Sequence, residues 1–261
     1  MVDYYYISVI SIGFGLQIRI NDIPIISDLT GEGITTDEPI NRWIKPGENK
    51  LSIRLEPPAI LPENISKPKL EVKAFIADPA SEAPKPGQML RDFTWPDPDI
   101  PVGEITYPYT HTADFPGGSS PSVKLWDEAE TLSGLTDHDH KNILHLINQL
   151  RQALINRQTS DAFSYLEYRY AEEARSEGKT LQRLRDVVIE QYDWMYSMGD
   201  ITIDPLVDEN ASFELVGNNQ VVFVEQKPNL SALHIYQPDS DLLFGIPVFL
   251  SKIKGQWTIV G

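Results

Sequence analysis

NDIP at residues 21–24 and INRWIKPGENKLSIR at residues 40–54 mark the stretch that decides the fold. Asn21-Asp22 and Pro46-Gly47 are turn sequences, because Asn and Asp side chains cap the backbone, Pro presets φ and Gly permits a positive φ. From residue 51 to residue 56 apolar and polar side chains alternate, as in a strand with one buried face. The stretch therefore predicts strands joined by turns, and it carries no catalytic group.

The apolar period is close to two from residue 3 to about residue 109, and turn residues interrupt it at short intervals. This pattern is typical of many short antiparallel strands. We therefore predict an all-β antiparallel sandwich for the first half of the chain. The expected strands are Tyr5 to Ile10, Leu16 to Ile20, Ile23 to Ile26, Lys50 to Leu55, Lys69 to Ile76 and Glu104 to Thr110.

A proline-rich segment follows, since nine of the 20 prolines lie within residues 78–121. Proline removes ladder donors, so we expect little regular structure there. Phe93 and Trp95 inside the segment indicate that part of it packs on a domain surface. We predict two domains: residues 1–118, a sandwich with this proline-rich segment at its C-terminal end, and residues 122–261.

After residue 121 the apolar period becomes helical. On the second expected helix Phe163, Leu166 and Tyr170 should face inward, whereas Glu172, Glu173 and Glu177 should face outward. The three expected helices run from Thr136 or Asp137 through Leu154, from Ser160 to Gly178 and from Thr180 to Met198.

Strand patterns return after the helices, with hairpin turns at residues 217–219 and 254–255. Helices that precede an antiparallel meander predict an α+β domain with three helices on one face of a curved antiparallel sheet. The expected strands are Ile201 to Ile203, Ser212 to Val216, Gln220 to Glu225, Leu230 to Tyr236, Gly245 to Ile253 and Gln256 to Val260.

The first half resembles jelly-roll or immunoglobulin-like accessory domains. In these domains a strand ends in an asparagine-containing turn, and a later segment reads Asn, hydrophobic, Lys, Pro or small, Gly, Asn, strand. The resemblance covers about half of the domain, and it implies carbohydrate binding or support of a neighbouring domain. The matching residues are Asn21, Asn41, Lys45, Gly47, Asn49 and the strand from Leu51.

The last hairpin, Phe244 to Val260, is similar to the closing strands of the nuclear-transport-factor and ketosteroid-isomerase class of α+β cones, or of cystatin-like domains. As in that class, a lysine-glycine turn leads to Trp257, a polar residue and a β-branched pair. The resemblance implies a pocket in which Asp or His acts as a base. A strand pair expected between the helices is absent from this sequence, and no residue matches a catalytic position.

The 261 residues carry a formal net charge of −16, and both halves of the chain are acidic. Such a field repels phosphate and anionic lipid, so we predict no nucleic-acid or membrane binding, and it favours a basic protein partner. The chain has no cysteine, which excludes disulfides and thiolate chemistry. Without a basic, apolar leader at the N-terminus, the expected location is cytoplasmic, unless a leader was removed.

Ligand-type side chains gather at residues 137–140, which read Asp-His-Asp-His. Consecutive residues fan out around a helix axis, and no histidine pair here has the i, i+4 spacing that metal sites use. The acids instead suit the first turn of a helix, where they complement its dipole. We predict no metal site and no cofactor.

Seven residues are the candidate binding residues. Asp200 and Asp204 lie on one side of a short strand, as solvent-facing acids or, alternatively, as a general base. His234 lies between apolar neighbours, as a sheet histidine usually does. Aromatic side chains suit an interface or, equally, a core. The candidates are Trp43, Trp95, Tyr165, Tyr168, Asp200, Asp204 and His234.

These patterns favour a non-enzymatic protein-binding module, with no catalytic residue assigned. One version is a bacterial immunity or accessory protein that binds a basic toxin through its acidic surface. A small-molecule-binding or isomerase-like enzyme with a pocket in the C-terminal cone is one alternative, and a carbohydrate-binding module in the N-terminal sandwich is another. The sequence leaves the oligomeric state open.

Overall fold

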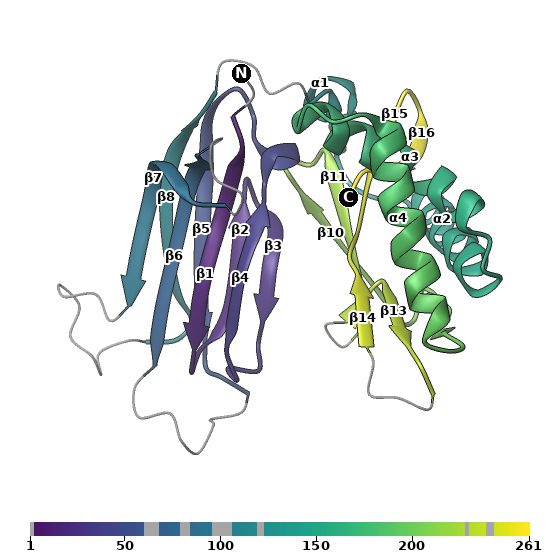
Figure 1. Ribbon diagram of the computed structural model, residues 1–261, viewed down its shortest axis with the longest axis horizontal. Coiled ribbons are helices and arrows are strands. Elements are labelled where there is room, and N and C mark those ends of the chain that lie inside the picture. The colour runs from purple at the N-terminus through teal and green to yellow at the C-terminus, as the bar shows by residue number, and fades with distance from the viewer. Residues whose placement is uncertain are drawn as a thin grey trace. The chain divides into compact units, whose positions relative to one another are not determined.

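The computed structural model describes residues 3–59, 68–78, 84–95, 106–118, 123–227, 230–238 and 243–261. Within these ranges the chain is rich in strands, and its four α-helices come after the first eight strands (Figure 1). The chain divides into two compact units, Met1–Pro121 and Ser122–Gly261, which we call unit 1 and unit 2. Among the helices of the described residues, none is both long and apolar enough to cross a lipid bilayer.

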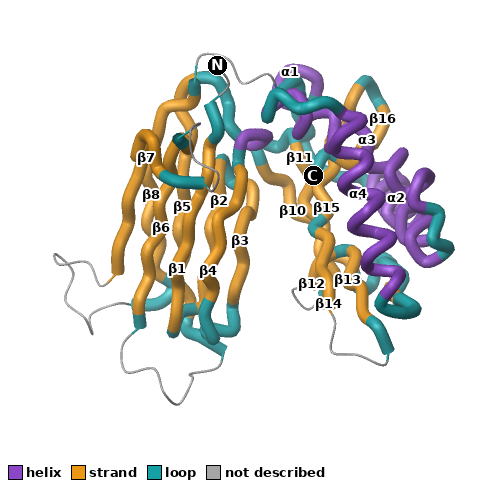
Figure 2. The backbone as a smooth tube through the Cα atoms, viewed as in Figure 1, coloured by secondary structure: helices purple, strands orange, loops and turns teal. Residues whose placement is uncertain are grey.

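Unit 1 contains two four-stranded antiparallel sheets, with the strand orders β4-β1-β6-β7 and β3-β2-β5-β8 (Figure 2). The sheets meet at their β7 and β8 edges, where the rings of Phe93 and His111 lie 4.5 Å apart. The strands are β1 Tyr5–Ile12, β2 Gly15–Ile20, β3 Ile23–Asp28, β4 Ile34–Pro39, β5 Gly47–Glu56, β6 Lys69–Ala77, β7 Pro86–Trp95 and β8 Tyr109–Gly117.

Alternation of side chains builds the core of unit 1 from both sheets. Ile7, Val9 and Val72 of one sheet and Ile18 and Ile53 of the other are fully buried. On β5 every second residue from 49 to 55 is buried, while the residues between them are exposed or half-buried. The period-two pattern of the sequence therefore placed these apolar residues on the inner faces.

Asparagines of the turn motif bond to the backbone. The buried Asn49 amide accepts a hydrogen bond from the Lys45 N–H (2.7 Å) and donates one to the Lys45 carbonyl (3.0 Å). The Asn21 amide donates to the Trp43 carbonyl (2.9 Å) and to Asn49 Oδ1 (2.8 Å), and it accepts from the Lys50 N–H (3.0 Å). These bonds satisfy backbone groups that no ladder reaches.

Asn41 has the same role at the other sheet. Its Oδ1 accepts from the Tyr5 N–H (2.6 Å), and its Nδ2 donates to the Asp3 carbonyl (2.7 Å). Asn21 and Asp22 also form the β2-β3 turn, with φ of 52° and 67°, values that Asn and Asp tolerate better than most residues. The asparagines of the turn motif therefore stabilise the turns and strand ends of unit 1.

The expectation of little regular structure in residues 78–121 is wrong for its described part, because β7 and β8 lie there. Both are edge strands, and Pro86 is the first residue of β7, a position where a missing N–H breaks no ladder.

The polar edge strand β4 was not predicted, because its sequence, ITTDEP, lacks an apolar alternation. Residues 104–105 of the predicted sixth strand lie outside the described residues.

Unit 2 begins with helices, in agreement with the helical period of the sequence. Thr136 caps α2 through a capping box with Asp139, as its position predicts. The short α1 was not predicted. The helices are α1 Leu125–Glu128, α2 Asp137–Ile155, α3 Thr159–Ser176 and α4 Leu181–Ser197.

The strands of unit 2 form two sheets where one curved sheet was expected. β10, β11, β15 and β16 follow one another in the first, with β12 paired to β11, and the second has the order β14-β13-β9. Pro247 separates β14 from β15, because a residue without an N–H interrupts the ladder. The strands are β9 Thr202–Ile203, β10 Ala211–Val216, β11 Val221–Gln226, β12 Leu230–Ser231, β13 Leu233–Tyr236, β14 Leu243–Ile246, β15 Val248–Ile253 and β16 Gln256–Ile259.

Figure 2 shows α2, α3 and α4 on one side of these sheets. Ile147 of α2, Leu166 of α3 and Val188 of α4 share one buried cluster with Val224 of β11 and Leu250 of β15. Burial of such side chains is worth about 1.5–3 kcal/mol each relative to exposure. This cluster holds the helices against the strands and fixes the position of the α3 and α4 residues that face β13 and β14.

Glu172, which was expected to face outward, is 2% exposed. Its Oε2 accepts hydrogen bonds from the Lys124 N–H (2.6 Å) and the Leu125 N–H (3.0 Å) at the start of α1, and it forms an ion pair with Arg175. The helical spacing of the sequence had predicted that Glu172 lies on the outer face of α3. The prediction failed because α1 covers that part of α3 and needs an acceptor for its free amides.

Candidate ligand pocket

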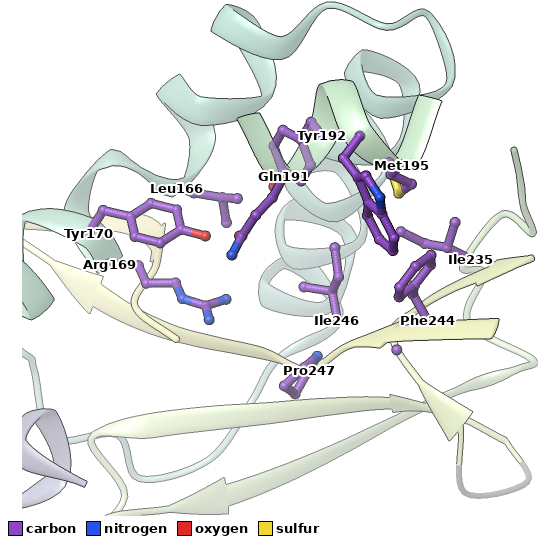
Figure 3. A pocket seen from close by; sticks show the side chains of 12 residues that line it. Leu166, Arg169, Tyr170, Gln191, Tyr192, Met195, Ile235, Phe244, Ile246 and Pro247 are labelled. Carbon is purple, nitrogen blue, oxygen red and sulfur yellow. The ribbon is translucent and has the colours of Figure 1, made fainter. Parts of the chain in front are cut away.

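A pocket of about 370 Å³ lies inside unit 2 between α3, α4 and the β13-β14 hairpin (Figure 3). Ligand sites in proteins typically span about 300–1,000 Å³, so this volume suits a small organic molecule. The lining residues are Leu166, Arg169, Tyr170, Gln191, Tyr192, Trp194, Met195, Ile235, Phe244, Gly245, Ile246 and Pro247.

One end of the pocket is apolar. The rings of Trp194 and Phe244 lie 6.2 Å apart and meet edge to face at 75°. Figure 3 shows Ile235 beside Phe244, and Met195 and Ile246 also line the pocket. Met195 and Ile235 are buried in the core of the unit, so this wall is supported from behind. The geometry suits an aromatic or aliphatic group, which would replace water along these side chains.

The other end of the pocket is polar. The Arg169 guanidinium, the Tyr170 hydroxyl and the Gln191 amide point toward one another there (Figure 3). The Arg169 Cζ lies 5.3 Å from the centroid of the Tyr170 ring, a cation–π contact. Arg169 Nε is buried and makes no hydrogen bond with any described residue.

Tyr192 adds a second phenol to the lining, and its side chain is largely buried. Burial raises the pKa of its hydroxyl well above the usual range; Tyr170 raises this pKa further, and the Arg169 charge opposes the shift. The hydroxyl therefore stays protonated at neutral pH and can donate a hydrogen bond.

Helix geometry explains how Arg169 reaches this pocket. Leu166, Arg169 and Tyr170 follow the i, i+3, i+4 spacing, which places three side chains on one face of α3. The candidate residues predicted from the sequence do not include Arg169. The available signal was a charged residue on an otherwise apolar helical stripe, between Leu166 and Tyr170.

None of the seven candidate binding residues lines the pocket. Trp43 and Trp95 are 2% and 3% exposed, so both rings are core residues of unit 1. The Arg42 guanidinium lies 4.8 Å from the Trp43 ring, and Trp95 packs beside Tyr109 at 6.0 Å. The sequence left open whether these aromatic side chains belong to an interface or to a core. Their burial places both in the core.

The two tyrosine candidates lie on α3. Tyr165 is half-buried against the core of unit 2. The Tyr168 hydroxyl donates to Glu128 Oε2 at 3.0 Å. Burial and this carboxylate raise the pKa of Tyr168. Its hydroxyl therefore ties α3 to α1.

The remaining candidates are near β9 and on β13. Asp200 is exposed and pairs with Arg157 at 2.7 Å. Asp204, also exposed, accepts a hydrogen bond from the Tyr236 hydroxyl at 3.3 Å. His234 is half-buried on β13, opposite Gly245. The rings of His234 and Tyr236 lie 6.3 Å apart, so Tyr236 neighbours both Asp204 and His234, whereas Asp200 pairs elsewhere.

A second, wider hollow of about 630 Å³ includes part of the Asp-His-Asp-His segment. There the His140 ring stacks on Phe213 at 4.3 Å, and its Nδ1 lies 3.7 Å from Asp208. Asp139 instead bonds to Thr136 and, at 3.1 Å, to the Trp257 indole. Among the described residues no group of three His, Cys, Asp or Glu side chains is arranged to hold a metal ion.

Comparison of the chain with protein-family models, with curated proteins and with solved structures gave no match in any of the three.

Proposed function

We propose that unit 2 binds a small, largely apolar molecule in the pocket between α3, α4 and the β13-β14 hairpin. The observation that carries this proposal is the pocket itself, with a volume of about 370 Å³, an aromatic wall and a polar end. Apolar walls with a few convergent polar groups are typical of ligand sites.

The lining favours binding over turnover. Its polar groups include two phenols, an amide and a guanidinium. An arginine does not give up its proton near neutral pH, and burial keeps Tyr192 protonated as well. These groups therefore suit hydrogen bonding to a ligand better than proton transfer.

A neutral fluorescent probe, N-phenyl-1-naphthylamine, tests this proposal. We expect saturable binding with increased probe fluorescence, and loss of that signal in Ile246→Trp, because the larger ring fills the pocket. Leu230→Trp is the matched control, since Leu230 is exposed on β12 and does not line the pocket. An absence of saturable binding, or equal binding by both variants, would contradict the proposal.

Protein binding remains the second candidate, and one face of α4 supports it. Val187 and Trp194 of α4 and Met198, its C-cap, are 42%, 56% and 38% exposed and follow the i, i+7, i+11 spacing of a helical stripe. With the net charge of −16, this stripe would suit a basic, amphipathic segment of a partner.

Capture of partners from the native host at low salt tests this candidate. We expect a protein that the wild type captures to be lost with the double variant Val187→Glu, Met198→Glu. Val207→Glu is the control, because Val207 is equally exposed but lies outside α4. Capture of nothing, or equal capture by both variants, would argue against binding through α4.

We also propose that unit 1 is an antiparallel β-sandwich domain and unit 2 an α+β domain. The two four-stranded sheets with buried inner faces support the first assignment, and the helices before an antiparallel meander support the second. Among the described residues of unit 1, every aromatic side chain is buried or half-buried. We therefore assign unit 1 a supporting role ahead of carbohydrate binding.

A further inference from the structure

We propose that the ligand of this pocket is an anion, a carboxylate joined to an apolar or aromatic body, whose head binds at Arg169 and whose body lies against Trp194 and Phe244. The inference rests on the proposed small-molecule function and names its ligand class. Four features of the pocket support it: an unpaired charge, the sign of the lining, the polar groups around that charge, and the aromatic wall opposite.

The unpaired charge is on Arg169. Arginine is permanently ionised, and a buried or half-buried charge is unfavourable unless it is paired. Within the described residues, Arg169 forms neither an ion pair nor a hydrogen bond, and its Nε is out of contact with solvent. The Tyr170 ring covers one side of the guanidinium, and no described residue accepts a hydrogen bond from the buried Nε. A bound carboxylate would provide that acceptor.

Two other arginines of unit 2 form ion pairs with carboxylates. Arg175, six residues further along α3, pairs with the buried Glu172. Arg157 pairs with Asp200 at 2.7 Å. This chain has 38 acidic residues, so partners for an arginine are plentiful, yet the described lining of the pocket offers Arg169 no carboxylate.

The groups around Arg169 match a small planar monoanion. A guanidinium presents parallel N–H groups that fit the two oxygens of a carboxylate. Figure 3 places the Gln191 amide on the same side of the pocket, where it can donate a further hydrogen bond. A phosphate dianion would call for more than one positive charge, and Arg169 is the one Lys or Arg among the described lining residues.

The aromatic wall defines the rest of the ligand. Trp194 and Phe244 meet edge to face, and a flat or aliphatic group packed against this pair would cover part of Trp194, which is 56% exposed in this structure. Removal of apolar surface from water is worth about 25 cal/mol per Å². The apolar end would thus supply affinity, and the Arg169 end would supply selection by charge.

Matched ligands that differ in the head group test the inference on the unmodified chain. 4-Phenylbutyrate, 4-phenylbutyramide, 4-phenylbutylamine and 3-phenylpropyl phosphate share one body and carry an anionic, a neutral, a cationic and a dianionic head. By titration calorimetry we expect the carboxylate to bind at least about tenfold more tightly than the amide, as hydrogen bonds to a charged group predict. We expect the amine to bind most weakly.

Variants locate the preference. Arg169→Met should bring the carboxylate down to the affinity of the amide, whereas Arg169→Lys, which keeps the charge but loses the fork, should retain part of the difference. Arg183→Met is the matched control, because it removes the same charge from an exposed position on α4 that does not line the pocket. It should bind like the wild type.

The outcomes separate this inference from the proposed function. If the neutral naphthylamine probe binds in the pocket but the carboxylate shows no advantage over the amide, or the phosphate binds most tightly, the carboxylate inference is wrong and the pocket proposal stands. If neither the probe nor any member of the series binds, both fail. Retention of the carboxylate preference by Arg169→Met would also overturn the inference.

Discussion

The polar residues of the turn motif in unit 1 and Arg169 in unit 2 have opposite surroundings. Asn49 is 1% exposed, and its amide bonds to Asn21 and to the Lys45 backbone. Arg169 is half-buried beside an apolar cavity and bonds to no described residue. A buried polar group that is fully paired serves the fold, whereas an unpaired one in a pocket needs another explanation, and for Arg169 we propose a ligand.

The same contrast exists within α3 alone. Glu172 and Arg175 pair with each other, and Glu172 also caps the first amides of α1. Arg169 lies less than two helical turns away without a carboxylate partner. Arg169 and Arg175 therefore differ in whether a carboxylate pairs with them, although both lie on the same helix of the same unit. Four changes, ordered by the size of the expected effect, test it.

Replacement of the most completely paired side chain should have the largest effect. Asn49→Ala removes the hydrogen bonds that its side chain makes with the Lys45 N–H, the Lys45 carbonyl and the Asn21 amide, and each buried group left unsatisfied costs about 1–3 kcal/mol. We expect the free energy of unfolding to fall by about 3–5 kcal/mol in urea denaturation. Asn142→Ala, at an exposed position of α2, should change it by less than about 0.5 kcal/mol. Similar values for the two variants would show that the motif is not structural.

Removal of the buried carboxylate of α3 should come next. Glu172→Ala removes the acceptor of the Lys124 and Leu125 N–H groups and the ion pair with Arg175. We expect a loss of about 2–3 kcal/mol, below the full value for a buried pair because Arg175 remains partly in water. Glu172→Gln keeps an oxygen for the amides and should lose less. Calorimetric melting measures both, and an unchanged melting temperature for Glu172→Ala would break the comparison.

The paired Asp139 predicts a pH effect of intermediate size. Hydrogen bonds from the Thr136 hydroxyl and backbone, with that of the Trp257 indole, lower the pKa of Asp139 to about 2 against opposing desolvation. Because the folded pKa lies below the unfolded value of 3.8, the stabilisation is present above pH 4 and disappears as the pH falls toward 2.

The expected loss is about 1–2 kcal/mol between pH 5 and pH 2. Asp139→Asn should reduce the pH dependence of unfolding by this amount, measured as the difference between its urea midpoints and those of the wild type across this range. Asp137→Asn, an exposed acid of the same helical turn, is the control. Parallel pH profiles for wild type and Asp139→Asn would contradict the assignment.

The smallest effect should have the opposite sign. Arg169→Met removes a charge with no partner, so we expect the free energy of unfolding to stay constant or to rise by up to about 1 kcal/mol. Arg175→Met, on the same helix, should lower it. Urea denaturation of the ligand-free protein measures both. A fall of more than about 1 kcal/mol for Arg169→Met would make Arg169 a structural residue and remove the contrast.

Local patterns predicted much of the secondary structure. The alternation from residue 51, the turn at Asn21-Asp22 and the Thr136 cap all lie within a few residues of the groups that they organise. Where local pattern was weak or misleading the predictions failed: the polar strand β4 has no alternation, and Pro86 starts a strand instead of preventing one. The division of the chain into two domains stays a prediction.

The pocket could not be predicted to the same degree. Its walls join α3 and α4 to β14, and these segments are about 50–80 residues apart in the chain. The seven candidate binding residues were selected by side-chain type. The type of a side chain does not show which residues it contacts in the folded protein. Trp43 looks like a binding aromatic and is a core residue, whereas Arg169 looks like an ordinary surface charge and faces a cavity.

The sequence by itself determined many of the strands, turns and helices of this protein, because backbone preferences and side-chain periodicity act between near neighbours. Tertiary structure alone decided which polar groups are paired. Glu172 became buried because α1, some 47 residues earlier, needed its oxygens, and Arg169 stayed unpaired because no acid from a distant segment reaches it within the described residues. Such pairing depends on contacts between remote parts of the chain, and in unit 2 these contacts create the site.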